Sequence, residues 1–257
     1  MMVHEYEYRG LMAQAWDVLR GDTSNWEDRF FYLEVIRMFG QPVLDVGCGT
    51  GRLLLDYLGL GIDVDGVDNS PEMLALCRQK AATLGLEPVL HQQYVESLSL
   101  PRRYRTILVP SSSLQLVVEP AAAEEAVARL HDHLLAGGVM AASIMTLWQP
   151  GDPLTSEWEK SATRVEDGVT FRRVARSWYE PELECEHTED VYQVIVDGQV
   201  VAEETHRRSP ATRSYTQAQA RALFERAGFE AVEVYHEFTF DPVRAEDTLF
   251  CVLARRA

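Results

Sequence analysis

The chain has 257 residues, of which 46% are hydrophobic and 25% are charged, and its formal net charge is −16. These values are typical of one large globular domain, or of one domain with an added segment, whose core needs no disulfides. The negative charge argues against DNA or RNA as the main partner. No apolar run is long enough to span a membrane, the N-terminus does not resemble a signal peptide, and the four cysteines are scattered, so we expect a cytoplasmic protein.

Taken in chain order, the first predicted elements are helices in residues 5–39, which make residues 1–40 an N-terminal helical cap. Buried strands and helices then alternate. The strands are predicted at 43–47, 63–68, 88–93, 104–110 and 139–145, and the helices at 52–60, 71–85 and 120–136. Gly137 and Gly138 are expected to end the last of these helices. The alternation predicts a parallel sheet with right-handed crossovers.

After residue 146 the pattern changes to strands alone. Residues 147–214 are predicted to be an antiparallel β insertion, with strands at 169–179, 187–196 and 199–208. A capping box at Thr216 then opens a helix, and strands at 229–238 and 249–256 end the chain. The predicted fold class is therefore α/β, a doubly wound Rossmann-like sheet in residues 41–146 and 215–257 with an insertion after its fifth strand.

The stretch VLDVGCGTGR, residues 43–52, places glycine at 47, 49 and 51 directly after a buried strand. A strand that turns at once into a helix leaves main-chain N–H groups free, and glycine lets a ligand approach them. Asp68 ends the next strand 19 residues after Gly49, where a carboxylate can accept hydrogen bonds from a ribose. Arg52 stands where the dinucleotide fingerprint has its third glycine, and no phosphate-binding GKS or GKT occurs. The stretch favours a nucleoside without phosphates.

VLDVGCGTGR followed by GVDNSPEML closely resembles the class I S-adenosylmethionine-dependent methyltransferases. YRTILVPSSSLQLV, LHDHLLAGGVMAAS and YTQAQARALFERAGF are similar to their fourth strand, fifth strand and late helix. The insertion resembles the small-molecule branch of the family, which includes aminosugar and glycine N-methyltransferases. The resemblance implies a methyltransferase sheet, S-adenosyl-L-methionine as cofactor and a small-molecule acceptor.

The resemblance also implies contacts of individual residues with the cofactor. Gly47 and Gly49 would line the methionine part, Asp68 the ribose, Asn69 and Met73 the adenine faces, Val95 and Glu96 the adenine edge, and Pro110 and Ser111 the methyl end. Tyr94 stands where many members carry Asp, so Glu96 is the candidate for the adenine amino group. Arg52 is a candidate partner of the cofactor carboxylate, and the alternative is a solvated helix residue.

Candidate acceptor residues are polar or aromatic groups expected at the mouth of this site. They are Gln115, Trp148, Trp16, Trp26 and Tyr32. The alternatives are a loop-capping amide for Gln115 and ordinary core packing for the aromatic residues. We expect no metal site, because DVDGVD fails the calcium-loop pattern and His131 and His133 do not share a helix face.

The sequence thus predicts a methyltransferase that transfers a methyl group in line to nitrogen or oxygen of a small molecule, mainly by positioning the partners. It identifies no catalytic base. The insertion is expected to build the acceptor pocket or a homodimer contact. A non-catalytic S-adenosylmethionine-binding module and a dinucleotide oxidoreductase remain the alternatives.

Overall fold

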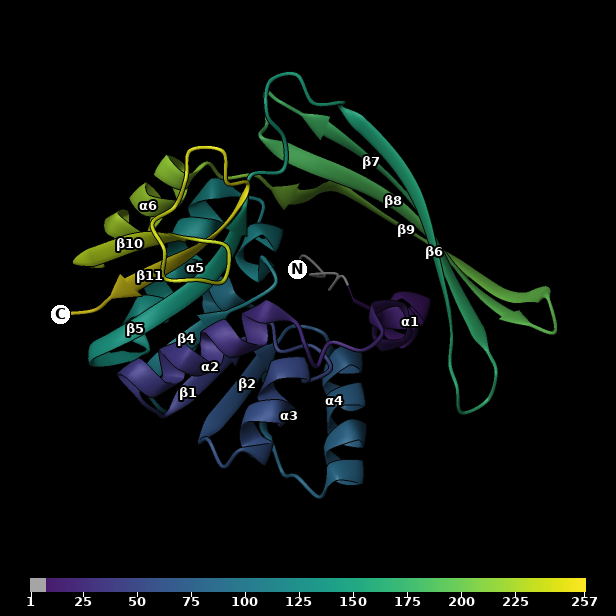
Figure 1. The fold of residues 1–257 in the computed structure, drawn as a ribbon, viewed down its shortest axis with the longest axis horizontal. Helices are drawn as coiled ribbons and strands as arrows, with labels where there is room; N and C mark the ends of the chain where they lie inside the picture. The colour runs from purple at the N-terminus through teal and green to yellow at the C-terminus, as the bar shows by residue number, and fades with distance from the viewer. Residues whose placement is uncertain (1–7) are drawn as a thin grey trace.

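The computed structural model describes residues 8–257, and the part of the predicted helical cap in residues 1–7 lies outside the described residues. A seven-stranded sheet has the order β10-β11-β5-β4-β1-β2-β3 (Figure 1). Its strands are β1 Val43–Val46, β2 Val64–Asp68, β3 Val89–Gln92, β4 Tyr104–Val109, β5 Leu134–Met145, β10 Ala231–His236 and β11 Leu249–Arg255. Strands β1 to β5 are parallel, and β11 is antiparallel to both β5 and β10. The predicted doubly wound sheet is confirmed.

Helices cover both faces of this sheet, and each face has its own apolar core. Helices α5 (Pro120–Asp132) and α6 (Gln217–Arg226) pack on one face, where Leu130 and Phe224 are fully buried. Helices α2 (Glu27–Phe39), α3 (Arg52–Gly59) and α4 (Pro71–Leu84) pack on the other. The three-layer arrangement buries the strands on both sides, which explains their nearly continuous apolar runs.

Local sequence sets where two of these helices begin. The Ser70 hydroxyl accepts a hydrogen bond from the main-chain N–H of Met73 at 3.1 Å, and Pro71 occupies the first helical position of α4. Thr216 and Gln219 form the predicted capping box of α6. Both helix starts are therefore fixed by residues within one turn. Among residues 8–257, every helix lacks the combination of length and apolar character that a membrane span needs.

A second, four-stranded antiparallel sheet stands beside the first (Figure 1). Its strands are β6 Thr155–Thr163, β7 Thr170–Glu180, β8 Cys185–Val196 and β9 Gln199–Arg213. Strand β6 was not among the predicted strands. It forms an edge and is exposed along nearly its whole length, so its sequence shows no alternation of apolar and polar residues. Whether this sheet is a domain of its own stays a prediction.

The prediction that Gly137 and Gly138 end a helix is wrong. Helix α5 ends at Asp132, and both glycines lie within β5. The main-chain N–H of Gly137 donates to the carbonyls of Arg256 and Ala257. A Cβ on Gly138 would stand 2.8 Å from the Leu135 carbonyl oxygen, so the chain passes too closely there for any side chain. The pair marks an irregularity where β5 joins β4, and not a helix end.

Helix α1 (Gly10–Arg20) lies between the two sheets (Figure 1). On one side Met12, Ala15 and Leu19 pack against Phe171 and Tyr192 of the second sheet. This apolar contact gives α1 a fixed place on the face of β7 and β8.

Polar contacts tie α1 to the main sheet as well. The Thr50 hydroxyl donates to Asp17 at 2.6 Å, and Lys80 of α4 lies 3.1 Å from the same carboxylate. At the start of α1, the main-chain N–H of Gly10 donates to Glu72 of α4 at 2.6 Å and that of Leu11 to Glu204 of β9 at 2.7 Å. Carboxylates at a helix N-terminus satisfy otherwise unpaired donors.

We expect Glu204→Gln to loosen the first turn of α1, because an amide oxygen accepts less strongly than a carboxylate. Amide hydrogen exchange in residues 11–14 should show protection lowered by about 1 kcal/mol. Glu203→Gln, next to it on β9 but exposed, is the control. Equal loss of protection in both variants would contradict the role given to Glu204.

Candidate functional site

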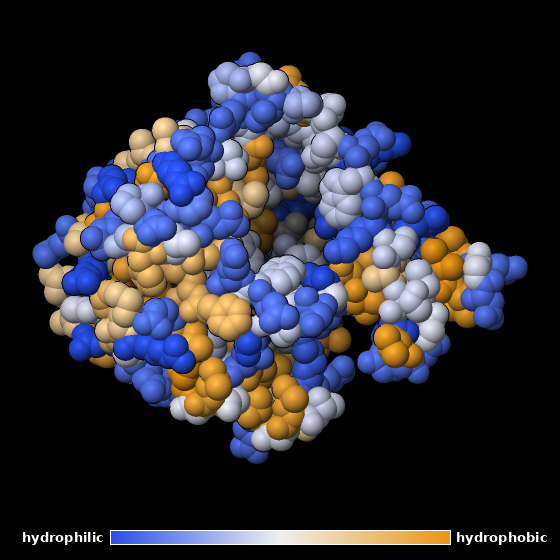
Figure 2. All heavy atoms as spheres, in the orientation of Figure 1, coloured by the Kyte–Doolittle hydropathy of each residue, from blue (hydrophilic) through white to orange (hydrophobic). Residues whose placement is uncertain are grey.

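The candidate site lies where the parallel strands β1 to β4 end. Strands β1 and β4 are neighbours, but the chain leaves them toward opposite sides of the sheet, and such a switch point opens a crevice at the carboxyl ends of the strands. Helix α1 and the second sheet stand opposite this edge. Figure 2 shows a hollow between the two parts of the molecule at this place.

The loop after β1, residues 47–51, which we call the glycine loop, has three glycines that lie close to neighbouring groups. Gly47, Gly49 and Gly51 all have positive φ, at 69°, 54° and 85°. A Cβ on Gly47 would stand 2.7 Å from the Ser113 hydroxyl oxygen, and one on Gly51 would stand 2.6 Å from the Cys77 sulfur. Close packing therefore requires glycine at Gly47 and Gly51. The N–H groups of residues 47, 48, 49 and 51 already donate to Val67, Val67, Asp68 and Cys48, so the free donors expected from the sequence are not found at these four positions. The contact of the glycine loop with a cofactor stays a prediction.

Asp68 ends β2 beside the glycine loop and is held there by main-chain donors. Its two carboxylate oxygens each accept one hydrogen bond, from the N–H of Gly49 and the N–H of Ser70, both at 2.9 Å. Burial raises the pKa of Asp68, and these hydrogen bonds oppose that rise. A carboxylate has about four acceptor positions, so this one retains capacity for the two hydroxyl groups of a ribose.

The residues predicted around adenine lie at the same edge of the sheet. Met73 is 2% exposed, and its methyl group lies 3.3 Å from where a Cβ on Gly49 would stand. Val95 and Glu96 belong to the short helix η1 (Val95–Ser97), which follows β3, and Asn69 follows Asp68 directly. Their contacts with adenine stay predictions.

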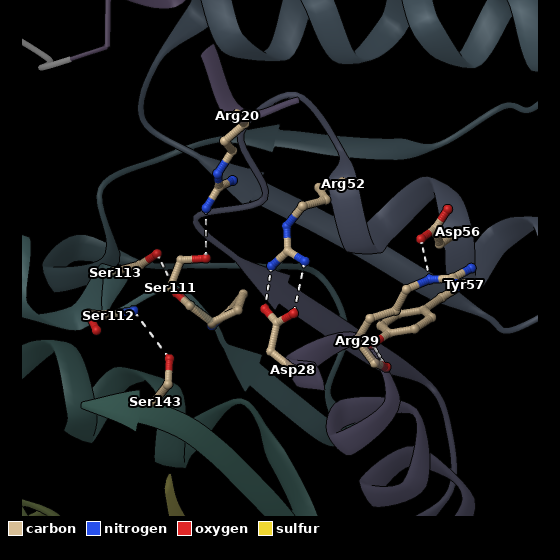
Figure 3. A network of polar contacts seen from close by, with 11 residues as sticks. Arg20, Asp28, Arg29, Arg52, Asp56, Tyr57, Ser111, Ser112, Ser113 and Ser143 are labelled. Atoms are coloured by element: carbon tan, nitrogen blue, oxygen red, sulfur yellow. Dashed lines mark hydrogen bonds and ion pairs between the residues drawn. The ribbon is translucent and has the colours of Figure 1, made fainter. Parts of the chain in front are cut away.

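The loop after β4, residues 111–113, which we call the serine loop, adopts a strained conformation. Ser111 and Ser112 have φ of 55° and 56°, in the left-handed region that costs a non-glycine residue roughly 1–3 kcal/mol. Three hydrogen bonds hold it (Figure 3): Arg20 to the Ser111 hydroxyl at 3.2 Å, the Ser112 N–H to the Ser143 hydroxyl at 3.2 Å, and the Ser113 hydroxyl to the Pro110 carbonyl at 2.7 Å. Strain of this kind is concentrated at functional sites.

Arg52 of α3 forms a bidentate ion pair with Asp28 of α2 (Figure 3). The two side chains are 11% and 6% exposed, so the alternative of a solvated helix residue is wrong. The Trp26 ring lies 5.1 Å from the guanidinium carbons of both Arg52 and Arg20. This aromatic and cationic cluster covers the start of α3, and the contact of Arg52 with a cofactor carboxylate stays a prediction.

Two of the acceptor candidates, Gln115 and Tyr32, are fully buried. The Gln115 amide group is fully buried and bridges the main chain of β5 and β9, with hydrogen bonds to Met145 and Arg213. This is the loop-capping role left open by the sequence. Tyr32 of α2 is fully buried with its ring edge-on to Phe31, and burial raises its pKa. Its hydroxyl has no hydrogen-bond partner among the described residues, and its contact with an acceptor stays a prediction.

The tryptophan candidates lie nearer the gap between the two sheets. Trp16 is half-buried on α1 beside Arg20, with 4.8 Å between its ring and the guanidinium carbon. Trp26 is exposed in the connection from α1 to α2. Trp148, in the connection from β5 to β6, stacks on Tyr179 of the second sheet with 5.5 Å between ring centres. Their contact with an acceptor stays a prediction.

Sequence reasoning missed Asp45, a carboxylate in the middle of β1. It is 1% exposed, and burial raises its pKa to about 7, opposed by the charge of Arg52. The sequence did contain a sign of this residue, an acid between apolar residues of a strand expected to be buried. A buried carboxyl group must either pair with a cation or hold a proton.

The comparisons with known proteins agree with this geometry. Residues 43–138 match the family model described as a methyltransferase domain. The chain is 26% identical over 230 residues to a dTDP-3-amino-3,6-dideoxy-alpha-D-glucopyranose N,N-dimethyltransferase from Streptomyces fradiae, a match that covers 86% of this chain and 85% of the relative. A dTDP-3-amino-3,4,6-trideoxy-alpha-D-glucopyranose N,N-dimethyltransferase from Streptomyces venezuelae is 27% identical over 52% of this chain and 54% of its own length.

Solved structures share the fold over nearly the full length. An S-adenosylmethionine-dependent methyltransferase from Clostridium acetobutylicum has a TM-score of 0.75 at 18% identity and covers 93% of this chain and 95% of its own. An amino pentose methyltransferase from Micromonospora echinaspora, solved with the cofactor bound, has a TM-score of 0.70 at 22% identity and covers 99% and 100%. The second sheet is therefore part of the shared fold.

Asp68→Ala should weaken binding of S-adenosylhomocysteine by roughly 1.5–3 kcal/mol for each charge-assisted hydrogen bond lost. Calorimetric titration measures this loss. Asp63→Ala is the control, since Asp63 is exposed at the opposite end of β2 and pairs with Arg102. A folded Asp68→Ala protein with unchanged affinity would refute the ribose contact.

The raised pKa of Asp45 predicts a stability that falls with pH. Between its ordinary value of 3.8 and the folded value of about 7, the folded chain holds a proton that the unfolded chain has lost, so stability decreases as pH rises through this window. Asp45→Asn mimics the protonated form and should be more stable than the parent at pH 8, by about 1–4 kcal/mol in urea unfolding, and similar to it near pH 4. Asp132→Asn is the control, because the Asp132 side chain is exposed. If the stabilities of the parent and of Asp45→Asn changed with pH in parallel, the raised pKa of Asp45 would be contradicted.

Proposed function

Since the chain is a class I S-adenosylmethionine-dependent methyltransferase that acts on a small molecule, we propose that its acceptor is the amino group of a nucleotide-linked amino sugar. The observation that carries this proposal is the match to the Streptomyces fradiae amino-sugar N,N-dimethyltransferase, which spans both the sheet that holds the candidate site and the second sheet. The sugar N-methyltransferase from Streptoalloteichus, with a TM-score of 0.70 over the whole chain, supports it.

The residues of the chain would act by binding and alignment. When bound, the cofactor supplies a methyl group on a positively charged sulfur. The glycine loop and Asp68 would hold the nucleoside and methionine parts, and the serine loop would border the methyl end. Alignment of this kind can supply about 7–11 kcal/mol of barrier reduction.

An amino acceptor suits the groups around the serine loop. The acceptor nitrogen must approach unprotonated, because its lone pair forms the new bond to carbon, and the proton it then carries can leave to water. The hydroxyl groups of the serine loop and of Ser143 could accept hydrogen bonds from an amine and so orient it. Methyl transfer to an unprotonated amine needs no strong base. A hydroxyl acceptor would require a base to remove its proton. The homodimer expected from the sequence stays a prediction.

Incubation with S-adenosylmethionine and a dTDP-linked 3-amino sugar should give products that carry one and then two added methyl groups on nitrogen, detected by mass spectrometry. The matched sugar with a hydroxyl in place of the amine should not react. Methylation of the hydroxyl sugar, or an inert amino sugar beside a reactive acceptor of another class, would refute the proposal.

A further inference from the structure

A pocket of about 220 Å³ lies between α1 and the second sheet, apart from the glycine loop and Asp68. It combines cationic and aromatic side chains from four elements. These are Trp16 and Arg20 of α1, Trp158 and Lys160 of β6, Arg173 of β7 and Tyr192 of β8.

The cations in this pocket are only partly offset by acids, since among the described residues Asp28 and Asp17 act on Arg20 without an ion pair within 4 Å. Arg173 pairs with the buried carboxylate of Asp190 at 2.9 Å. Within the described part of the chain, neither Arg20 nor Lys160 contacts a carboxylate directly. In residues 8–257, Arg20 and Lys160 therefore line the pocket as cations without a direct ion pair, and they favour an anionic ligand such as a phosphate group.

The aromatic groups offer a flat surface beside these charges. Trp158 is 44% exposed, and the guanidinium carbon of Arg173 lies 4.6 Å from its ring centre, so one face of the indole is covered. Tyr192 is almost fully buried and forms the floor. An exposed indole held by a cation is a suitable platform for a nucleobase.

Arg20 connects this pocket to the candidate acceptor site. One end of its guanidinium reaches the Ser111 hydroxyl at 3.2 Å, while the same side chain lines the pocket (Figure 3). Burial and the like charge of Arg52 lower the pKa of Arg20, and a neighbouring anion would relieve this cost. A ligand bound in the pocket would therefore lie next to the serine loop, with Arg20 between them.

We propose that this pocket binds the nucleoside diphosphate end of the acceptor, with the diphosphate between Arg20 and Lys160 and the base against Trp158. The inference rests on the proposed function, because it takes the acceptor to be an amino sugar joined to a nucleotide. It assigns the second sheet a direct part in substrate recognition.

The test is calorimetric titration of the full chain, in the presence of S-adenosylhomocysteine, with dTDP and with inorganic pyrophosphate. The expected result is saturable binding of dTDP and weaker binding of pyrophosphate. Lys160→Gln should weaken dTDP binding about fivefold to tenfold through loss of one phosphate contact. Trp158→Ala should weaken it about tenfold or more through loss of stacking.

Arg176→Gln is the matched control, since Arg176 lies on the opposite face of β7 and pairs with the exposed Glu157. It should leave dTDP binding unchanged, and S-adenosylhomocysteine binding should be unchanged in all three variants. No binding of dTDP, equal affinity for pyrophosphate, or unaltered affinity in both Lys160→Gln and Trp158→Ala would overturn the inference.

These outcomes separate the pocket from the proposed function, because the titration contains no sugar and needs no turnover. Methylation of a free amino sugar without dTDP binding would remove the nucleotide pocket and keep the amino acceptor. Binding of dTDP, combined with no methylation of amino sugars, would keep the nucleotide pocket and reject the amino acceptor.

Discussion

The close passage of the glycine loop beside the serine loop is the constraint on which the site depends. Strands β1 and β4 are neighbours in the sheet, so the loops that follow them must share a narrow space. The contact of Gly47 with Ser113 leaves no room for a Cβ, and Asp68 locks the far side of the glycine loop through the N–H of Gly49. This edge of the candidate site is thus shaped by close contacts of main chain with Ser113 and Asp68.

Helix α1 lies outside both sheets and connects them. Its apolar side packs on the second sheet, its Asp17 accepts from Thr50 within the glycine loop, and its last residue, Arg20, reaches the serine loop. One helix therefore contacts the glycine loop, the serine loop and the second sheet.

The features that sequence predicted well are local. The Ser70 start of α4 and the capping box at Thr216 each depend on residues within one turn. The cofactor contacts of the glycine loop and Asp68 stay predictions. Features that depend on distant partners were missed. Asp28 lies 24 residues from Arg52, and nothing local identifies one as the partner of the other. Strand β6 is polar because it is an edge, and Gly137 with Gly138 could equally end a helix or relieve a crowded strand.

The hydrogen bonds at the first turn of α1 link the two sheets. Glu72 of α4 and Glu204 of β9 accept hydrogen bonds from the adjacent amides of Gly10 and Leu11, so the start of α1 is tied to both sheets. A displacement of the second sheet relative to the main sheet would strain both of these hydrogen bonds and the Asp17–Thr50 contact, so the positions of the two sheets are coupled through α1.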